Sequence, residues 1–171
     1  GRLDEAASFN GERFIDMGDV ANFGYDDKFT LSAWIYPEAS DGVVISRAAA
    51  GEQGEQGYGL YLNGGKVQVN MSQRWLDDGV RVETKDPLRL NEWQHVLVTY
   101  DGTKVPTGFR VYVNGKLEET SYLLDGINNR IEQDEPLRIG ASGAQRPRFQ
   151  GHIDDVRIYR ESLTAAQAAV V

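Results

Sequence analysis

Trp75 is the residue whose type and setting most directly suggest chemistry. It lies in a polar segment, residues 71–79, among amide, arginine and aspartate side chains. A large indole exposed in such a segment suits stacking on a sugar face, with flanking hydrogen bonds from its neighbours. The alternative is ordinary packing, in which the indole folds back onto a sheet. We predict a ligand-binding surface at Trp75, with Arg74, Tyr58 and Tyr61 as further candidates.

The other reactive groups are poorly arranged for catalysis. Paired carboxylates fall in predicted turns and loops, where solvated charge is the simplest interpretation: Asp77-Asp78, Glu118-Glu119, and Glu52 with Glu55. His95 lies inside a predicted strand and His152 precedes another, settings typical of structural histidines. There is no cysteine, no Gly-x-Ser-x-Gly elbow and no phosphate-binding glycine motif. A Ser-His-Asp arrangement stays open, because its members need only meet in space.

Length and charge exclude several classes of function. A chain of 171 residues fits one domain, and no apolar run approaches the roughly 20 residues that span a bilayer. The formal net charge of −8 opposes a phosphate backbone, and the 18 lysines and arginines are scattered. We expect residues 1–171 to be a single domain excised from a larger protein, with no nucleic-acid partner and no membrane insertion.

Short β-strands must position the candidate side chains. Every second residue of Phe29–Tyr36 is apolar, and Pro37 ends the run because it cannot donate to a ladder. Asn63-Gly64 and Asn114-Gly115 each separate two such runs and favour hairpins with type I′ turns. Further strand-like runs are Ala7–Phe9, Phe14–Met17, Val43–Ser46, Val80–Thr84, Trp93–Tyr100, Leu137–Ile139 and Ile153–Tyr159. Ten or so strands exceed one flat sheet, which indicates two stacked sheets.

Two polar segments and one helix complete the predicted elements. Ala49–Gly57 is a glycine-rich polar loop, and Leu123–Glu135 is a second polar stretch. Ser162–Ala169 is a short helix for which Thr164 is a suitable N-cap. The predicted fold is therefore all-β, a two-sheet antiparallel β-sandwich with a short C-terminal helix.

Five motifs, taken in order, resemble the laminin-G-like, concanavalin-A-like lectin/glucanase superfamily. They cover nearly the whole chain: Ser8–Gly11, Phe29–Pro37, Glu92–Gly102, Val111–Lys116 and Gly151–Arg160. Each is weak alone, but their order and spread give a strong joint signal. The resemblance implies a two-sheet jelly roll.

The same superfamily contains laminarinase-type glycoside hydrolases, whose retaining mechanism needs two carboxylates about 5 Å apart. In that resemblance the pair lies on one strand as Glu-x-Asp-x-Glu or Glu-x-Asp-x-x-Glu. The nearest match here starts at Glu132 and Asp134, but its last position falls on Pro136 or Leu137. We therefore predict that the chain is not an enzyme.

The resemblance also implies one structural calcium ion at the sandwich edge, and it maps a ligand onto Asp154. Period-two alternation places Asp154 on one face with Val156 and Ile158, where an unpaired carboxylate is costly. Asn10 and Asp19 are the predicted partners in a shell of hard oxygens. The alternative is that Asp154 accepts hydrogen bonds from backbone amides of the N-terminal strand.

Three functions follow from the resemblance. The first is a non-catalytic module that binds a carbohydrate or glycoconjugate, with a structural calcium, in an extracellular or cell-surface protein. The alternative is a protein-interaction or architectural domain that docks onto neighbouring domains of its parent protein. A divergent glycoside hydrolase is the least favoured. Fold alone supports all three, so the site must decide.

Overall fold

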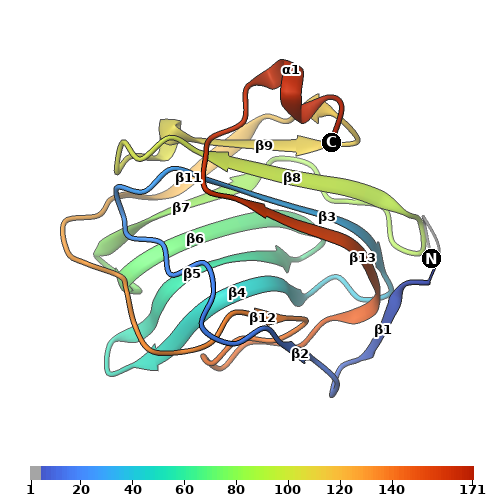
Figure 1. The fold of residues 1–171 in the computed structure, drawn as a ribbon, viewed down its shortest axis with the longest axis horizontal. Helices are drawn as coiled ribbons and strands as arrows, with labels where there is room; N and C mark the ends of the chain where they lie inside the picture. Colours follow the sequence, from blue (N-terminus) through green and yellow to red (C-terminus); the bar gives the residue numbers. More distant parts are fainter. Residues whose placement is uncertain (1–4) are drawn as a thin grey trace.

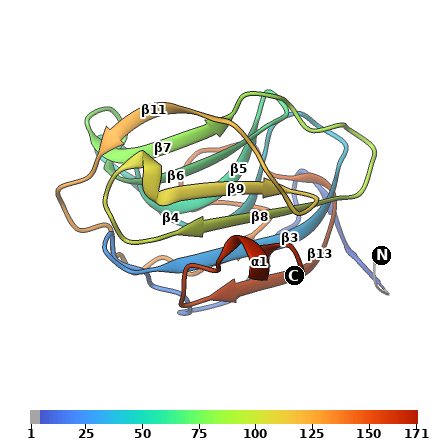
Figure 2. The same cartoon turned by 90° about the horizontal axis from the view of Figure 1, so that it is seen from above.

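The computed structural model describes residues 5–171, whose strands form two stacked sheets (Figures 1 and 2). Within that range, one sheet has six strands in the order β1-β13-β3-β8-β9-β10, and the other has seven in the order β11-β7-β6-β5-β4-β12-β2. All paired strands run antiparallel. The all-β, two-sheet prediction is confirmed.

The strand bounds follow the sheet order. The six-stranded sheet contains β1 (Ala7–Asn10), β13 (Gln150–Tyr159), β3 (Phe29–Pro37), β8 (Gln94–Tyr100), β9 (Phe109–Val113) and β10 (Lys116–Leu117). The seven-stranded sheet contains β11 (Thr120–Gly126), β7 (Asp78–Thr84), β6 (Lys66–Arg74), β5 (Gly54–Asn63), β4 (Gly42–Gly51), β12 (Arg138–Ile139) and β2 (Ile15–Asp16). A 3₁₀ turn, η1 (Pro106–Gly108), and one helix, α1 (Ala165–Ala168), complete the structure.

Period-two alternation places the core between the sheets. The apolar residues of β3 are fully buried and belong to the main core cluster: Phe29, Leu31, Ala33 and Ile35. Leu60 and Leu62 of β5 and Val80 and Val82 of β7 belong to the same cluster. The intervening residues of each strand therefore point to the outer faces of the sandwich.

Both predicted hairpin turns are present. Asn63 pairs with Lys66 across Gly64-Gly65, and Val113 pairs with Lys116 across Asn114-Gly115. Gly64 and Gly65 have φ values of 58° and 80°, and Asn114 and Gly115 have values of 51° and 77°. These left-handed conformations are those of a type I′ turn, which matches the twist of the flanking strands.

The predicted helix is also confirmed, and it covers part of the six-stranded sheet. Thr164 and Gln167 form a reciprocal capping box at the start of α1. Ala168 and Leu163 pack on Leu97 and Tyr112, which point outward from β8 and β9, in a small second apolar cluster.

Three segments predicted as loops contain strand. The glycine-rich segment 49–57 is mostly the hairpin of β4 and β5, with Gly51 paired to Gly54. Segment 71–79 is mostly β6 and β7, and the polar stretch from Leu123 begins inside β11. The glycines allow the pairing rather than break it: a Cβ on Gly57 would lie 2.2 Å from the Arg47 carbonyl oxygen. Only glycine permits this close approach at a φ of 123°.

Candidate functional site

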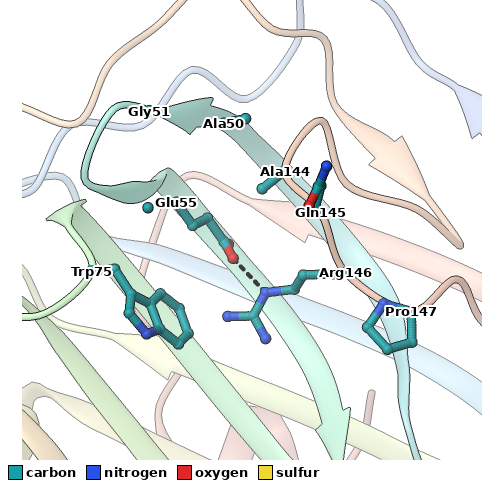
Figure 3. A pocket seen from close by; sticks show the side chains of 9 residues that line it. Ala50, Gly51, Glu55, Trp75, Ala144, Gln145, Arg146 and Pro147 are labelled. Carbon is teal, nitrogen blue, oxygen red and sulfur yellow. Dashed lines mark hydrogen bonds and ion pairs between the residues drawn. The ribbon is translucent and has the colours of Figure 1, made fainter.

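A pocket of about 540 Å³ opens at one end of the seven-stranded sheet. Its walls are the β4–β5 turn, the turn between β6 and β7, and the loop at 144–147 (Figure 3). Its side chains include Glu55, Trp75, Arg146 and Pro147. This volume lies within the range of small-molecule binding sites.

The floor of the pocket follows from the composition of β5. Glu55, Gly57, Gly59 and Tyr61 alternate with core residues, so they share the outer face of the strand. A Cβ on Gly59 would lie 2.1 Å from Tyr61 Oη, which shows that the Tyr61 ring lies along the strand over this glycine. The Tyr61 hydroxyl thereby reaches Glu55 and donates a hydrogen bond to its Oε1.

Arg146 closes the floor from the loop side. Its Nε donates to Glu55 Oε2 in an ion pair, the dashed line of Figure 3. Its guanidinium carbon lies 4.0 Å from the centre of the Tyr61 ring and 4.6 Å from that of the Trp75 ring. Glu55 and Arg146 are 4% and 16% exposed, so the pair is largely removed from water.

Trp75 forms the opposite wall because Gly54 leaves room for it. A Cβ on Gly54 would lie 2.4 Å from Trp75 Cβ, and the Trp75 backbone N–H donates to the Gln53 carbonyl at 3.0 Å. The guanidinium carbon of Arg81 lies 3.4 Å from the centre of the indole ring. Trp75 is half-buried, so part of its ring edge and surface faces the pocket.

Burial and neighbouring charges set the protonation of this cluster. The pKa of Tyr61 is raised well above its usual range, mainly by burial and next by the Glu55 charge, so the phenol stays a hydrogen-bond donor. The pKa of Arg81 is lowered to about 10, first by burial and then by the positive charge of Arg146. At neutral pH both guanidiniums are charged and repel each other.

The structure brings two of the four predicted ligand-binding residues together. Trp75 lines the pocket, and Tyr61 forms its floor through Glu55 and Arg146. Arg74 lies outside it, in an ion pair with Asp77 at 2.8 Å. Tyr58 faces the opposite side of β5 and belongs to the core, where its hydroxyl donates to the Ala21 carbonyl at 2.7 Å.

Three pocket residues have no counterpart in the sequence prediction: Glu55, Arg81 and Arg146. Glu55 was interpreted as solvated loop charge because the strand character of its glycine-rich segment was missed. The usable signal is the spacing Glu55-x-Gly57-x-Gly59-x-Tyr61, which puts two polar groups and an empty trough on one strand face. Arg146 carries no such signal, because it is 91 residues from its partner.

The incomplete glycosidase motif does not lie on a strand. Glu132, Asp134 and Pro136 belong to the irregular segment between β11 and β12. Glu132 accepts a hydrogen bond from the Ile131 backbone N–H at 3.1 Å. Period-two alternation therefore does not apply there, and nothing aligns these carboxylates on one face.

The predicted calcium ligands do not converge. Asn10 accepts from the backbone N–H groups of Glu12 and Arg13 at 3.1 and 3.0 Å, whereas Asp19 forms an ion pair with Arg47 at 2.7 Å. Asn10 pairs with Gln150, which is four residues from Asp154, or about 13 Å along a strand. Within residues 5–171, no three His, Cys, Asp or Glu side chains form a metal-binding group. These residues do not fit one calcium site.

A β-bulge explains why the face of Asp154 was predicted wrongly. The register of β13 against β3 shifts between Asp154 and Arg157, and Asp155 has a φ of 48°. Asp154 consequently pairs with Trp34, on the outer face, instead of sharing the core face with Ile158. Its Oδ1 accepts from the Asp155 backbone N–H at 2.9 Å. The burial argument for a metal partner at Asp154 therefore fails.

Comparison with known proteins identifies the family and the fold. A laminin G family model, described as the concanavalin A-like lectin/glucanases superfamily, matches residues 9–169. The adhesion G-protein coupled receptor V1 of Danio rerio is 25% identical over 154 residues, which are 81% of this chain. The chain spans only 2% of the length of that receptor.

Two solved structures share the fold at low identity. The CBM40 of the Ruminococcus gnavus IT-sialidase, bound to α2,3-sialyllactose, has a TM-score of 0.72 at 15% identity and covers 97% of this chain and 96% of its own. Domain 4 of AbnA, an extracellular arabinanase of Geobacillus stearothermophilus, was solved with arabinotriose. It has a TM-score of 0.63 at 18% identity and covers 99% of this chain and 77% of its own. No helix among the described residues is long and apolar enough to cross a membrane.

Proposed function

We propose, because this chain belongs to the concanavalin A-like lectin/glucanases superfamily, that it is a non-catalytic domain that binds carbohydrate in the pocket beside Trp75. The observation that carries the proposal is the pocket itself, in which an indole wall faces a buried arginine–glutamate pair. Two proteins of the same fold were solved with sialyllactose and arabinotriose, which supports a glycan ligand.

The geometry suggests how a sugar would be held. The accessible surface of Trp75 provides apolar contact with a ring face, and Arg146 lies opposite it as a donor (Figure 3). The Tyr61–Glu55–Arg146 cluster fixes that donor before a ligand arrives, which reduces the ordering cost of binding. Arg74, which lies just outside on the Trp75 turn, remains a candidate for contacts with a longer glycan.

The proposal includes an extracellular or cell-surface location, because the arabinanase that carries a domain of this fold is extracellular. Its partner is a glycan, free or on a glycoprotein. A structural calcium ion, implied by the superfamily, would need ligands other than the set of Asn10, Asp19 and Asp154.

The docking alternative has one specific observation in its favour. Leu117, Tyr122 and Leu123 are 53%, 56% and 48% exposed, and they lie on or next to β10 and β11, an edge strand of each sheet. Exposed apolar groups at sheet edges are suited to contact with a neighbouring domain. This surface is distant in sequence from the pocket and can be altered independently of it.

Affinity electrophoresis of the chain through gels containing soluble polysaccharides tests the proposal. We expect at least one polymer to retard the parent protein, and Trp75→Ala to weaken that retention by about tenfold or more, consistent with the loss of one aromatic stack. Leu76→Ala is the matched control, since Leu76 is 82% exposed in the same turn.

Full retention of Trp75→Ala would remove the pocket as the binding site. Migration unaffected by every polymer would favour the docking alternative instead.

A further inference from the structure

We propose that the ligand of this pocket is an acidic glycan, whose anionic group lies against the guanidinium groups of Arg146 and Arg81. This inference rests on the proposed function and specifies its substrate class. It follows from the charges and hydrogen bonds of the pocket.

The pocket holds more positive charge than its carboxylates balance. Arg146 and Arg81 both lie against the Trp75 ring, and Glu55 is the carboxylate among the residues that line the pocket. Both Glu55 oxygens are already engaged, Oε1 by Tyr61 and Oε2 by Arg146. No second carboxylate forms an ion pair with either arginine in residues 5–171, which leaves the cluster with one positive charge in excess.

Arg81 is held in place by neutral groups only. Its Nε donates to Asn70 Oδ1 at 3.1 Å and its Nη2 donates to the Trp75 carbonyl at 2.8 Å. These bonds orient the guanidinium without neutralising it. Burial and the nearby Arg146 charge lower the pKa of Arg81, so an anion in the pocket would relieve an existing repulsion.

Arg146 has donor capacity to spare. Its Nη2 is buried and has no hydrogen-bond partner in the structure. Buried donors in folded proteins are almost always satisfied, and one that is not costs free energy. A small movement of the 144–147 loop on binding would let a carboxylate or sulfate oxygen accept from this group in a charge-assisted hydrogen bond.

The local charge is the reverse of that of the whole chain. The sequence carries a formal net charge of −8, so a pocket with an excess cation is not explained by general surface composition. Neutral sugars are recognised by hydroxyl hydrogen bonds and stacking, for which a second buried guanidinium brings only a desolvation cost. An acidic sugar uses both cations.

Isothermal titration calorimetry with matched probes tests the inference. The probe pairs are α2,3-sialyllactose with lactose, polygalacturonate with its carboxyl-reduced form, and dextran sulfate with dextran. We expect at least one acidic member to bind tenfold or more tightly than its neutral partner, with an affinity that falls as NaCl is raised. The first two pairs report on a carboxylate and the third on a sulfate.

Two variants locate the effect, and one serves as a control. Arg146→Gln and Arg81→Gln should each reduce acidic-probe affinity by about tenfold, because one charged contact is worth about 1.4 kcal/mol or more. Arg148→Gln removes the same charge from the same loop at an exposed residue outside the pocket lining, and should bind as the parent does. Arg81→Gln matters most if Arg146→Gln fails to fold, since Arg81 has no ion-pair partner to orphan.

Neutral probes that bind as tightly as their acidic partners would overturn the inference while leaving the proposed function standing. Equal losses in Arg148→Gln and Arg81→Gln would overturn the assignment to this pocket. If all six probes and the polysaccharide panel fail to bind, the proposed function falls, and this inference falls with it.

Discussion

The outer faces of the two sheets are made by the same alternation of side chains but are covered in opposite ways. On the seven-stranded sheet, charged and polar groups converge, and Tyr61, Glu55 and Arg146 are buried together beneath the loop at 144–147. On the six-stranded sheet, α1 covers one end with apolar side chains. The other end carries Tyr36, Trp93 and His152, whose ring centres lie 5.8 to 6.3 Å apart beside a second hollow.

The difference shows what turns a sheet face into a specific site. The Tyr36–Trp93–His152 hollow has aromatic surface, but its one ion pair, between His152 and Glu38, is 3.8 Å long and exposed. The pocket at Trp75 has fewer rings and a donor fixed by a buried network. Prior fixation of a polar group, rather than aromatic content, distinguishes the two faces.

The largest expected effect is on stability, from removing the carboxylate of each face. Glu55→Ala should lower the free energy of unfolding by about 3 kcal/mol, because Arg146 would be left buried without its partner. Glu38→Ala should cost less than about 0.5 kcal/mol, because its pair with His152 is exposed. Urea denaturation followed by tryptophan fluorescence measures both. Equal costs would contradict the contrast between the faces.

Gly54 should be the next most sensitive position. Gly54→Ala is expected to destabilise the protein by about 1–3 kcal/mol and to displace Trp75, because its φ is 98° and the added Cβ would meet the indole side chain. Gly126→Ala is the control in β11, where a Cβ meets open space. Thermal unfolding compares the two, and the account is wrong if Gly54→Ala is as stable as Gly126→Ala.

A smaller effect concerns acid stability on the six-stranded face. His95 is buried and shares a 2.7 Å hydrogen bond with Ser32, and burial lowers its pKa below 6.5, with Asp155 opposing and Arg157 adding to the shift. The unfolded chain therefore takes up a proton first, and stability is lost as the pH falls below 6.5.

The measurement is denaturation at a series of pH values between 7 and 4.5. His95→Gln should flatten the pH dependence, whereas His152→Gln, at a half-exposed residue on the same face, should keep the parental slope. The same slope in parent and His95→Gln would contradict this assignment.

The smallest expected effect concerns calcium. Because Asn10, Asp19 and Asp154 do not converge, Asp154→Asn should leave any calcium-induced shift in melting temperature unchanged. Differential scanning fluorimetry with calcium and with chelator provides the comparison. A parental calcium shift that disappears in Asp154→Asn would restore Asp154 as a ligand.

The parts of the fold that local rules govern could be predicted from sequence. The alternation in Phe29–Tyr36, the Asn-Gly turns and the Thr164 cap each depend on a few adjacent residues. The lengths of β4 and β5 could not, because Gly54 and Gly57 were taken as loop signals although they permit close strand contact.

The candidate site was predictable only in part for the same reason. Trp75 and Tyr61 stand out by residue type, but Arg146 reaches Glu55 through the tertiary fold. The face of Asp154 depends on one bulged residue, Asp155, whose left-handed backbone the alternation rule does not anticipate. Long-range pairing and single-residue bulges are set by the folded structure and leave little trace in local sequence.

The most direct test of the account is to map the bound glycan by NMR, titrating ¹⁵N-labelled protein with an oligosaccharide of whichever probe binds. The account predicts that the largest shift changes occur at the Trp75 indole N–H and in the backbone of residues 53–55 and 144–147. Changes concentrated instead at Tyr36, Trp93 and His152 would place the binding site on the other face and contradict it.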